Sequence, residues 1–260
     1  MIAFMHDMFS QRMKLPHGLT GAFAALLVSA ALFSGCASQN ADIKRDAAGL
    51  YGSAVESYLS GKLEESERGL KAILEDHPLS RYATDAQLMI ADVSYSMEHY
   101  EDAGSYYTSF VALHPSHPRA AYAQFQKGLS HFKDVLSLDR DQTATRKAIF
   151  AFEDLLAAYP DSPYSPRAKE LVSFLKNRLA EREFYIARFY FKNKNYKGAL
   201  GRLRDILTQY PDSGINDKTL FYIGESYRAL GERELAEETF SALITNYPGS
   251  PFALDAKGKL

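Results

Sequence analysis

The 260-residue chain has an ordinary composition for a folded protein, with 46% hydrophobic and 24% charged residues and a formal net charge of −2. This near-neutral balance, without a basic stripe or a run of like charges, argues against a nucleic-acid-binding protein. Cys36 is the only cysteine, which excludes a disulfide within the chain and a multi-cysteine zinc site.

A secretory signal peptide is predicted at the N-terminus. An apolar run over residues 18–35 follows Lys14 and His17 and is short for a transmembrane helix, which needs about 20 residues. Several methionines precede the run, so translation could begin at Met1 or at Met13. The layout indicates a leader that is removed on export.

The apolar run ends in Leu32-Phe33-Ser34-Gly35-Cys36, which resembles the bacterial lipobox. Phe33 stands where that motif usually has Leu. A chance cysteine after an ordinary signal fits less well, because the only cysteine stands where the apolar run stops. We therefore expect residues 1–35 to be removed, Cys36 to be lipidated, and residues 36–45 to form a tether. Asp after the cysteine retains many lipoproteins in the inner membrane, and Ala37 at that position favours the outer membrane.

The remaining chain contains a recurring helix stop. Proline ends a helix and disfavours helical geometry in the residue before it. A serine follows each proline within two residues, and serine is a favoured N-cap, so we expect each following helix to begin there. The stops are His77-Pro78, His114-Pro115, Tyr159-Pro160, Tyr210-Pro211 and Tyr247-Pro248, and the serines are Ser80, Ser116, Ser162, Ser213 and Ser250.

Between these stops, two amphipathic helices are predicted per repeat, and each carries one small residue. The pattern Leu220-x-x-Ile223-Gly224-x-x-Tyr227, then Ala236-x-x-x-Phe240, resembles the tetratricopeptide repeat. We predict an all-α, tetratricopeptide-like solenoid of about five helix pairs. The small residues are 12 positions apart in four repeats, Ala54 with Ser66, Ala91 with Ala103, Ala187 with Ala199, and Gly224 with Ala236.

Two irregularities interrupt the repeat. Gly128 and Ala148 are 20 residues apart, so the third repeat carries eight extra residues, near 134–146. From Pro160 to Ala187 is 27 residues, 14 more than in the other repeats, which is close to four helical turns. We therefore predict one long helix from Pro166 to about Lys192. The expected organisation is repeats one to three over 46–160, and the long helix, repeats four and five and a capping helix over 161–260.

The lipobox, the helical repeats, the insertion and the long helix together resemble the BamD family of outer-membrane lipoproteins, most specifically over residues 174–213. The resemblance implies a lipid-anchored scaffold of the β-barrel assembly machine on the periplasmic face of the outer membrane. It implies contacts with a periplasmic domain of the BamA-type barrel subunit, with other Bam lipoproteins and with unfolded outer-membrane proteins. No nucleic acid, cofactor or metal is expected.

Two sets of residues are candidate partner contacts. The resemblance places Arg202 and the insertion residues Asp139, Arg140 and Asp141 near partner contacts, although the insertion could equally be a self-satisfied turn and Arg202 a solvated arginine. Two positions of each first helix face the concave side in the tetratricopeptide register, and they could form a groove for an extended peptide or could pack as core. Through the first three repeats they are Tyr51, Tyr58, Leu88, Tyr95, Phe125 and Phe132.

Alternative functions have weaker support. His114 and His117 lack further nearby metal ligands, so we interpret them as helix-end and turn residues. Glu225-Ser226 resembles the Glu-Ser pair of lytic transglycosylases, but both residues lie within the repeat pattern, and we predict no enzyme. A general tetratricopeptide lipoprotein adaptor, such as a secretin pilot or a division-linked factor, is the alternative function, and it should lack the insertion and the long helix.

Overall fold

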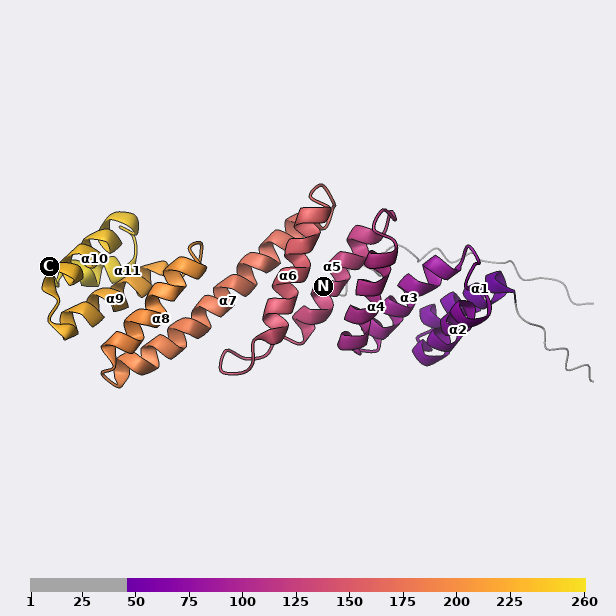
Figure 1. Ribbon diagram of the computed structural model, residues 1–260, viewed down its shortest axis with the longest axis horizontal. Helices are drawn as coiled ribbons and strands as arrows, with labels where there is room; N and C mark the ends of the chain where they lie inside the picture. The colour runs from indigo at the N-terminus through magenta and orange to yellow at the C-terminus, as the bar shows by residue number, and fades with distance from the viewer. Residues whose placement is uncertain (1–45) are drawn as a thin grey trace, which may run out of the picture. The chain divides into compact units, whose positions relative to one another are not determined.

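The computed structural model describes residues 46–260, and the predicted signal peptide, Cys36 and the tether lie outside this range. The described chain forms eleven helices and contains no strand (Figure 1), as predicted. None of these helices is both long and apolar enough to cross a membrane. The helices are α1 (Ala47–Leu59), α2 (Leu63–Asp76), α3 (Ala83–Ser96), α4 (Tyr100–Leu113), α5 (Ala120–Lys133), α6 (Thr143–Ala158), α7 (Ser165–Lys192), α8 (Tyr196–Gln209), α9 (Asn216–Leu230), α10 (Arg233–Asn246) and α11 (Pro251–Lys257).

Each helix packs mainly against the helices before and after it in the chain, and α11 also packs against α9. This neighbour-to-neighbour stacking is the arrangement of a repeat solenoid, in which one pair cannot bury its apolar face alone. We number the pairs from one to five: α1 with α2, α3 with α4, α5 with α6, α7 with α8, and α9 with α10.

All ten of the predicted small residues are buried. Four positions after the small residue of each second helix stands a large side chain that is at most 1% exposed. In the third and fifth pairs this side chain is a phenylalanine lying directly over a glycine of the first helix. The five large residues are Leu70, Tyr107, Phe152, Leu203 and Phe240.

The five helix stops share one backbone geometry. The residue before each proline has φ between −135° and −132° and ψ between 48° and 58°, outside the helical region as expected before proline. Its carbonyl accepts a hydrogen bond from the amide three residues later, which closes a turn. The chain therefore leaves the second helix of every pair through the same type of turn.

The prediction that serines cap the following helices is correct only for Ser250, whose hydroxyl accepts from the amide of Phe252 at 3.1 Å in the first turn of α11. Elsewhere a second turn intervenes. The hydroxyls of Ser80 and Ser162 accept from amides two residues later, before the helix has begun. The N-caps of α3, α5, α7 and α9 are instead Tyr82, Arg119, Tyr164 and Ile215.

The long helix is confirmed: α7 spans 28 residues, roughly 42 Å at 1.5 Å per residue. The eight extra residues of the third pair are divided between two places. Six lengthen the connector between α5 and α6 to nine residues, 134–142, against three in the first, second and fourth pairs. The other two add to the start of α6, which has 16 residues where α2, α4 and α8 have 14.

Substitution by alanine should have opposite effects on stability at two glycines. One lies at the close approach within the fifth pair, and the other is exposed on α8. A Cβ on Gly224 would lie 2.5 Å from a ring carbon of Phe240, whereas a Cβ on Gly201, exposed on α8, would meet nothing within 4 Å. Gly224→Ala should therefore destabilise the protein by about 1–3 kcal/mol through overpacking. Gly201→Ala should stabilise it by about 0.5–1 kcal/mol through helix propensity. Urea unfolding followed by circular dichroism measures both, and equal effects at the two sites would contradict the packing argument.

Candidate partner-binding surfaces

The predicted groove aromatics of the first pair bridge consecutive first helices. The ring of Tyr51 stacks on that of Tyr82 with centroids 5.4 Å apart, and the hydroxyl of Tyr58 lies 3.0 Å from that of Ser96. Both contacts join α1 to α3 or its N-cap, and both tyrosines remain partly exposed. They thus pack between repeats and still present ring surface to solvent.

Tyr95, Phe125 and Phe132 are also partly buried, and the two phenylalanines bridge α5 to the beginning and middle of α7. Phe125 stacks on Tyr164 at 5.2 Å, and Phe132 packs against Phe174 at 6.1 Å. Leu88 differs from the other five, because it is 0% exposed within the core cluster of α3, α4 and α5. Leu88 therefore contributes to the core, and we leave it out of the groove.

The insertion holds its conformation through hydrogen bonds of its own. Ser137 donates to Asp139 at 2.6 Å, which lowers the pKa of this carboxyl, and Asp141 accepts from the amide of Thr143 at 2.9 Å. The side-chain amide of Gln142, 1% exposed, donates to the carbonyls of Ser137 and Arg140. The loop is thus organised around a buried glutamine, which the sequence analysis missed.

The charged side chains of this insertion point outward. Asp139, Arg140 and Asp141 are all exposed, and Arg140 forms no ion pair with any described residue. Arg178 of α7 donates to the carbonyl of Leu136 and braces the loop against the long helix. The insertion is therefore a fixed loop with accessible charges rather than a turn closed by its own ion pairs.

Arg202 on α8 is not simply solvated. Its Nη1 atom donates to Glu183 of α7 at 3.0 Å, and Glu183 also accepts from Arg182 at 3.1 Å. The side chain of Arg202 stays 43% exposed, while that of Glu183 is 15% exposed. The carboxylate thus orients the guanidinium, whose other donors remain available to a second acceptor.

A polar cluster that the sequence analysis did not identify joins the second and third pairs. The carboxylate of Asp92 accepts from the hydroxyls of Tyr107 at 2.7 Å and Tyr122 at 2.8 Å, and from Arg119 at 3.3 Å. These donors come from α4, α5 and the residue before α5. Burial raises the pKa of Asp92, and the hydrogen bonds from Tyr107 and Tyr122 oppose this effect. No short-range spacing pattern could have indicated this cluster.

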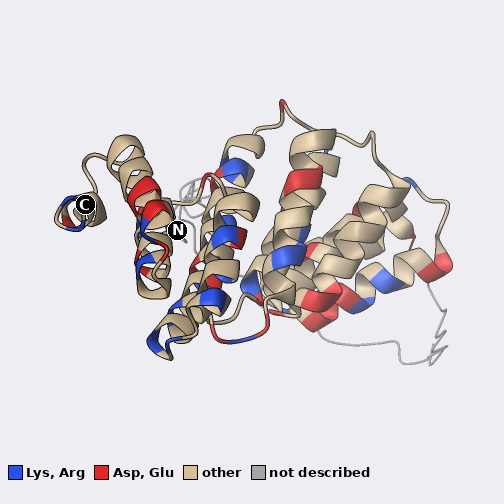
Figure 2. Cartoon of the chain, turned by 60° about the vertical axis from the view of Figure 1, so that its left-hand side comes forward, with Lys and Arg blue, Asp and Glu red and all other residues tan. Residues whose placement is uncertain are grey.

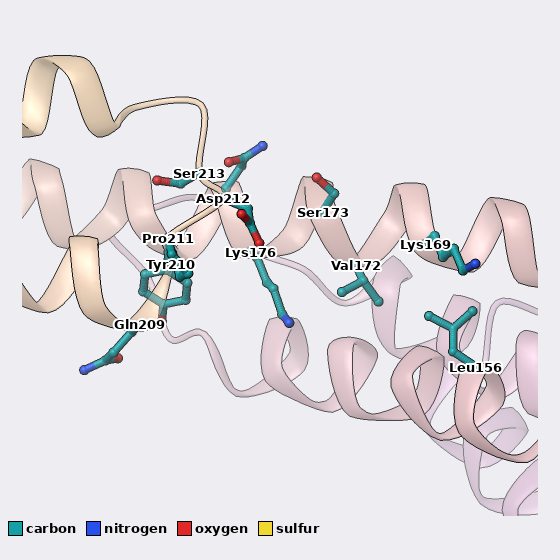
Figure 3. A pocket seen from close by; sticks show the side chains of 11 residues that line it. Leu156, Lys169, Val172, Ser173, Lys176, Gln209, Tyr210, Pro211, Asp212 and Ser213 are labelled. Carbon is teal, nitrogen blue, oxygen red and sulfur yellow. The ribbon is translucent and has the colours of Figure 1, made fainter. Parts of the chain in front are cut away.

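A cleft of about 480 Å³ lies along α7, between the end of α6 and the turn that joins α8 to α9. Tyr210 and Pro211 lie at one end and Leu156 at the other, with Val172 and Lys176 between them (Figure 3). The extra turns of α7 hold α6 and this turn apart along its length. The sequence feature related to this cleft was the predicted 14-residue extension of α7. The length of a helix alone does not indicate that a cleft lies beside it.

The remaining candidate residues take part in contacts within the fold. Acidic and basic residues are interspersed along the helices (Figure 2). Glu225 pairs with Arg228 at 2.8 Å and with Lys259 at 3.3 Å, and the hydroxyl of Ser226 donates to a carbonyl of its own helix. His114 and His117 end and follow α4, where His117 accepts from the amide of Arg119 at 3.1 Å, as the turn residue we predicted. No cluster of potential metal ligands occurs among the described residues.

The buried carboxylate predicts a pH dependence of stability. Because the folded-state pKa of Asp92 is raised above its ordinary 3.8, protonation favours the folded state. The stability that Asp92 contributes relative to Asn is therefore greatest below that value and is lost as the pH rises through the folded pKa. The difference in unfolding free energy between the wild type and Asp92→Asn should fall between pH 3.5 and pH 7 in urea titrations, and a rising difference would show that the hydrogen bonds outweigh burial.

The chain matches known proteins over most of its length. Residues 44–241 match the YfiO family model, described as an outer membrane lipoprotein. The outer membrane protein assembly factor BamD of Haemophilus influenzae is 32% identical over 85% of this chain and 89% of its own length. BamD of Rickettsia prowazekii is 30% identical over 89% of this chain and 93% of its own. Among solved structures, the TPR2AB domain of yeast Sti1 matches with a TM-score of 0.45 and 15% identity, covering 82% of each chain. The chain therefore belongs to the BamD family of outer membrane protein assembly factors.

Proposed function

We propose that the protein is a non-enzymatic, lipid-anchored scaffold of the outer-membrane β-barrel assembly machine. The observation that carries this proposal is the family match, which extends over nearly all of the described chain. The helical-repeat fold supports it, because stacked helix pairs expose long surfaces suited to binding other proteins. The insertion and the long helix favour this function over a general tetratricopeptide adaptor.

In this proposal Cys36 carries the lipid that holds the protein on the periplasmic face of the outer membrane. Arg202 and the charged loop residues Asp139, Arg140 and Asp141 contact the periplasmic domain of a BamA-type barrel subunit or other lipoproteins of the machine. Arg202 supports such a role through its geometry, since Glu183 fixes one edge of the guanidinium and leaves donors for a partner carboxylate.

The proposal also gives a function to the partly exposed rings of the first three pairs. Tyr51, Tyr58, Tyr95, Phe125 and Phe132 would receive the C-terminal strand of an unfolded outer-membrane protein, whose alternating apolar side chains need a few anchoring pockets. Rings that are held by a neighbouring repeat on one side lose little freedom on binding. This favours them as anchors over fully mobile surface side chains.

The first prediction of this proposal concerns the barrel partner. The tagged, lipidated protein, purified in mild detergent from the envelope, should retain a BamA-type barrel in stoichiometric amount. Arg202→Ala should weaken this association roughly ten-fold or more, which corresponds to about 1.4 kcal/mol per factor of ten. Its own stability should change by at most about 1 kcal/mol, as for other exposed ion pairs.

Arg167→Ala is a matched control, because Arg167 also forms an exposed ion pair, with Glu170 at 2.6 Å, but lies in the first turn of α7. This variant should retain the barrel. Glu183→Gln tests the orienting role and should give an intermediate loss. A folded, membrane-localised wild type that recovers no barrel would refute the assembly-machine proposal and favour the general adaptor.

The second prediction concerns substrate. Tyr58→Ala with Tyr95→Ala should weaken binding of a synthetic peptide that copies the C-terminal strand of an outer-membrane protein and ends in Phe, by at least ten-fold in fluorescence anisotropy. Phe150→Ala removes a ring that is 65% exposed on α6, outside the proposed groove, and should leave the affinity unchanged.

Loss of folding is separated from loss of binding by a second variant. Tyr58→Phe with Tyr95→Phe keeps both rings and removes the hydroxyl contact with Ser96, so it should bind the peptide as the wild type does. Unchanged affinity in a properly folded double-alanine variant would sink the groove hypothesis.

A further inference from the structure

The C-terminal half of α7 exposes two aromatic rings on one face. Tyr185 is 60% exposed and Phe189 is 64% exposed. Three residues follow Tyr185 at spacings of three, four and seven, which places them on the same side of the helix: Arg188, Phe189 and Lys192. The four side chains together line a shallow hollow of about 320 Å³. We name this set the α7 face. Two large rings side by side in solvent are unusual enough to need an explanation.

The position of the two rings in the repeat explains their exposure. Tyr185 and Phe189 lie two positions before and two positions after the buried small residue of their helix, Ala187. In the second pair the same positions are Met89 and Val93, and both are buried in a cluster with the preceding helix α2.

The third and fifth pairs follow the same rule. Their equivalent residues are partly or fully buried, and Tyr222 packs its ring against Phe184 of the preceding α7 at 5.2 Å. No helix pair precedes the first pair among the described residues, and both positions there are exposed and carry no large apolar side chain. The equivalent residues are Gln126 and Ser130 in the third pair, Tyr222 and Ser226 in the fifth, and Gly52 and Glu56 in the first.

The length of α7 explains why the α7 face is uncovered. The first half of α7 packs on α6 through a cluster that ends at Leu179. The second half packs on α8 and α9 through a cluster that begins at Ala180. Because α6 packs only against the first half of α7, no preceding helix covers the residues of the second half that contact a preceding helix in the other pairs. Its side chains are nevertheless aromatic, unlike those of the first pair.

The surroundings of the α7 face are basic. Residues 184–204 contain six Lys or Arg residues and no Asp or Glu. Arg202 and Arg204 are engaged with Glu183 and Tyr227. The side chains of Arg188 and Lys192 form no hydrogen bond or ion pair with any residue in the described range 46–260. A partner that covers the rings therefore meets two unpaired cations.

We propose that the α7 face binds an amphipathic helix of another protein, with its apolar side on Tyr185 and Phe189 and acidic residues opposite Arg188 and Lys192. This helix would take the place that the preceding helix pair takes elsewhere in the stack. The register argues for a helical occupant, because the equivalent positions contact helices, and the charges argue for an acidic one. The proposal goes beyond the scaffold function and does not depend on it.

The test uses the full, lipidated protein in its native envelope, with Tyr185 replaced by the photoreactive residue p-benzoylphenylalanine. Irradiation should produce one protein adduct, and mass spectrometry should map the cross-link to an acidic, amphipathic helical segment. Introducing Arg188→Glu and Lys192→Glu into the same chain should reduce the yield at least five-fold. The same photoreactive residue at Phe150, which is 65% exposed on α6, serves as the control, and its adducts should not respond to these charge reversals.

A fold control accompanies the test. Tyr185→Ala with Phe189→Ala should leave the Tm unchanged, because neither ring is buried in the isolated protein, and should abolish co-purification of the partner that the cross-link identified. Adducts with lipid, with a second copy of this chain or with a non-helical or basic segment would each overturn the proposal. The absence of any adduct, or a yield that charge reversal does not alter, would overturn it as well.

Discussion

Each helix pair depends on a contact between a small residue on its first helix and a large buried side chain on its second. Glycine at this point lets Phe152 and Phe240 lie directly against the facing backbone of α5 and α9. Alanine stands at the same point in the second and fourth pairs, where Ala91 shares a core cluster with Tyr107 and Ala187 shares one with Leu203. The contact sets the distance between the two helices, because protein interiors are packed too closely to absorb even one added methyl group without strain. The five identical helix stops then repeat the geometry along the stack.

Departures from this repeat create the surfaces that the protein can use. The four additional turns of α7 separate α6 from α8, which opens the cleft beside Tyr210 and leaves Tyr185 and Phe189 without a covering helix. The nine-residue connector before α6 exposes charged residues, among them Asp139, Arg140 and Asp141, and it keeps its form because the buried side chain of Gln142 bonds to two of its carbonyls. If all repeats were equal, a neighbouring helix would cover the cleft and the rings of Tyr185 and Phe189. The charged connector would be absent.

Polar side chains reinforce the stacking between pairs at particular points. Asp92 gathers two tyrosine hydroxyls and an arginine across α3, α4 and α5, so both oxygens of its largely buried carboxylate accept hydrogen bonds. Glu183 similarly joins α7 to α8 through Arg202. Such residues fix how neighbouring helices sit, whereas apolar contacts alone tolerate sliding. The bond to Glu183 also holds the guanidinium of Arg202 in a defined orientation.

The sequence by itself determined the helical class, the register of the small residues, the positions of the helix stops and the extent of α7. These features are local, since they depend on proline geometry and on a periodicity visible within one repeat. The capping role assigned to most of the serines was wrong because a second turn, which serine preference does not reveal, intervenes before the next helix. Only the tertiary structure decided that Leu88 is core while Tyr58 keeps exposed ring surface, and that Arg202 is paired with Glu183. It also decided which face of α7 lacks a neighbour. Burial and pairing at these positions depend on side chains from other helix pairs, and residue spacing along one chain does not carry that information.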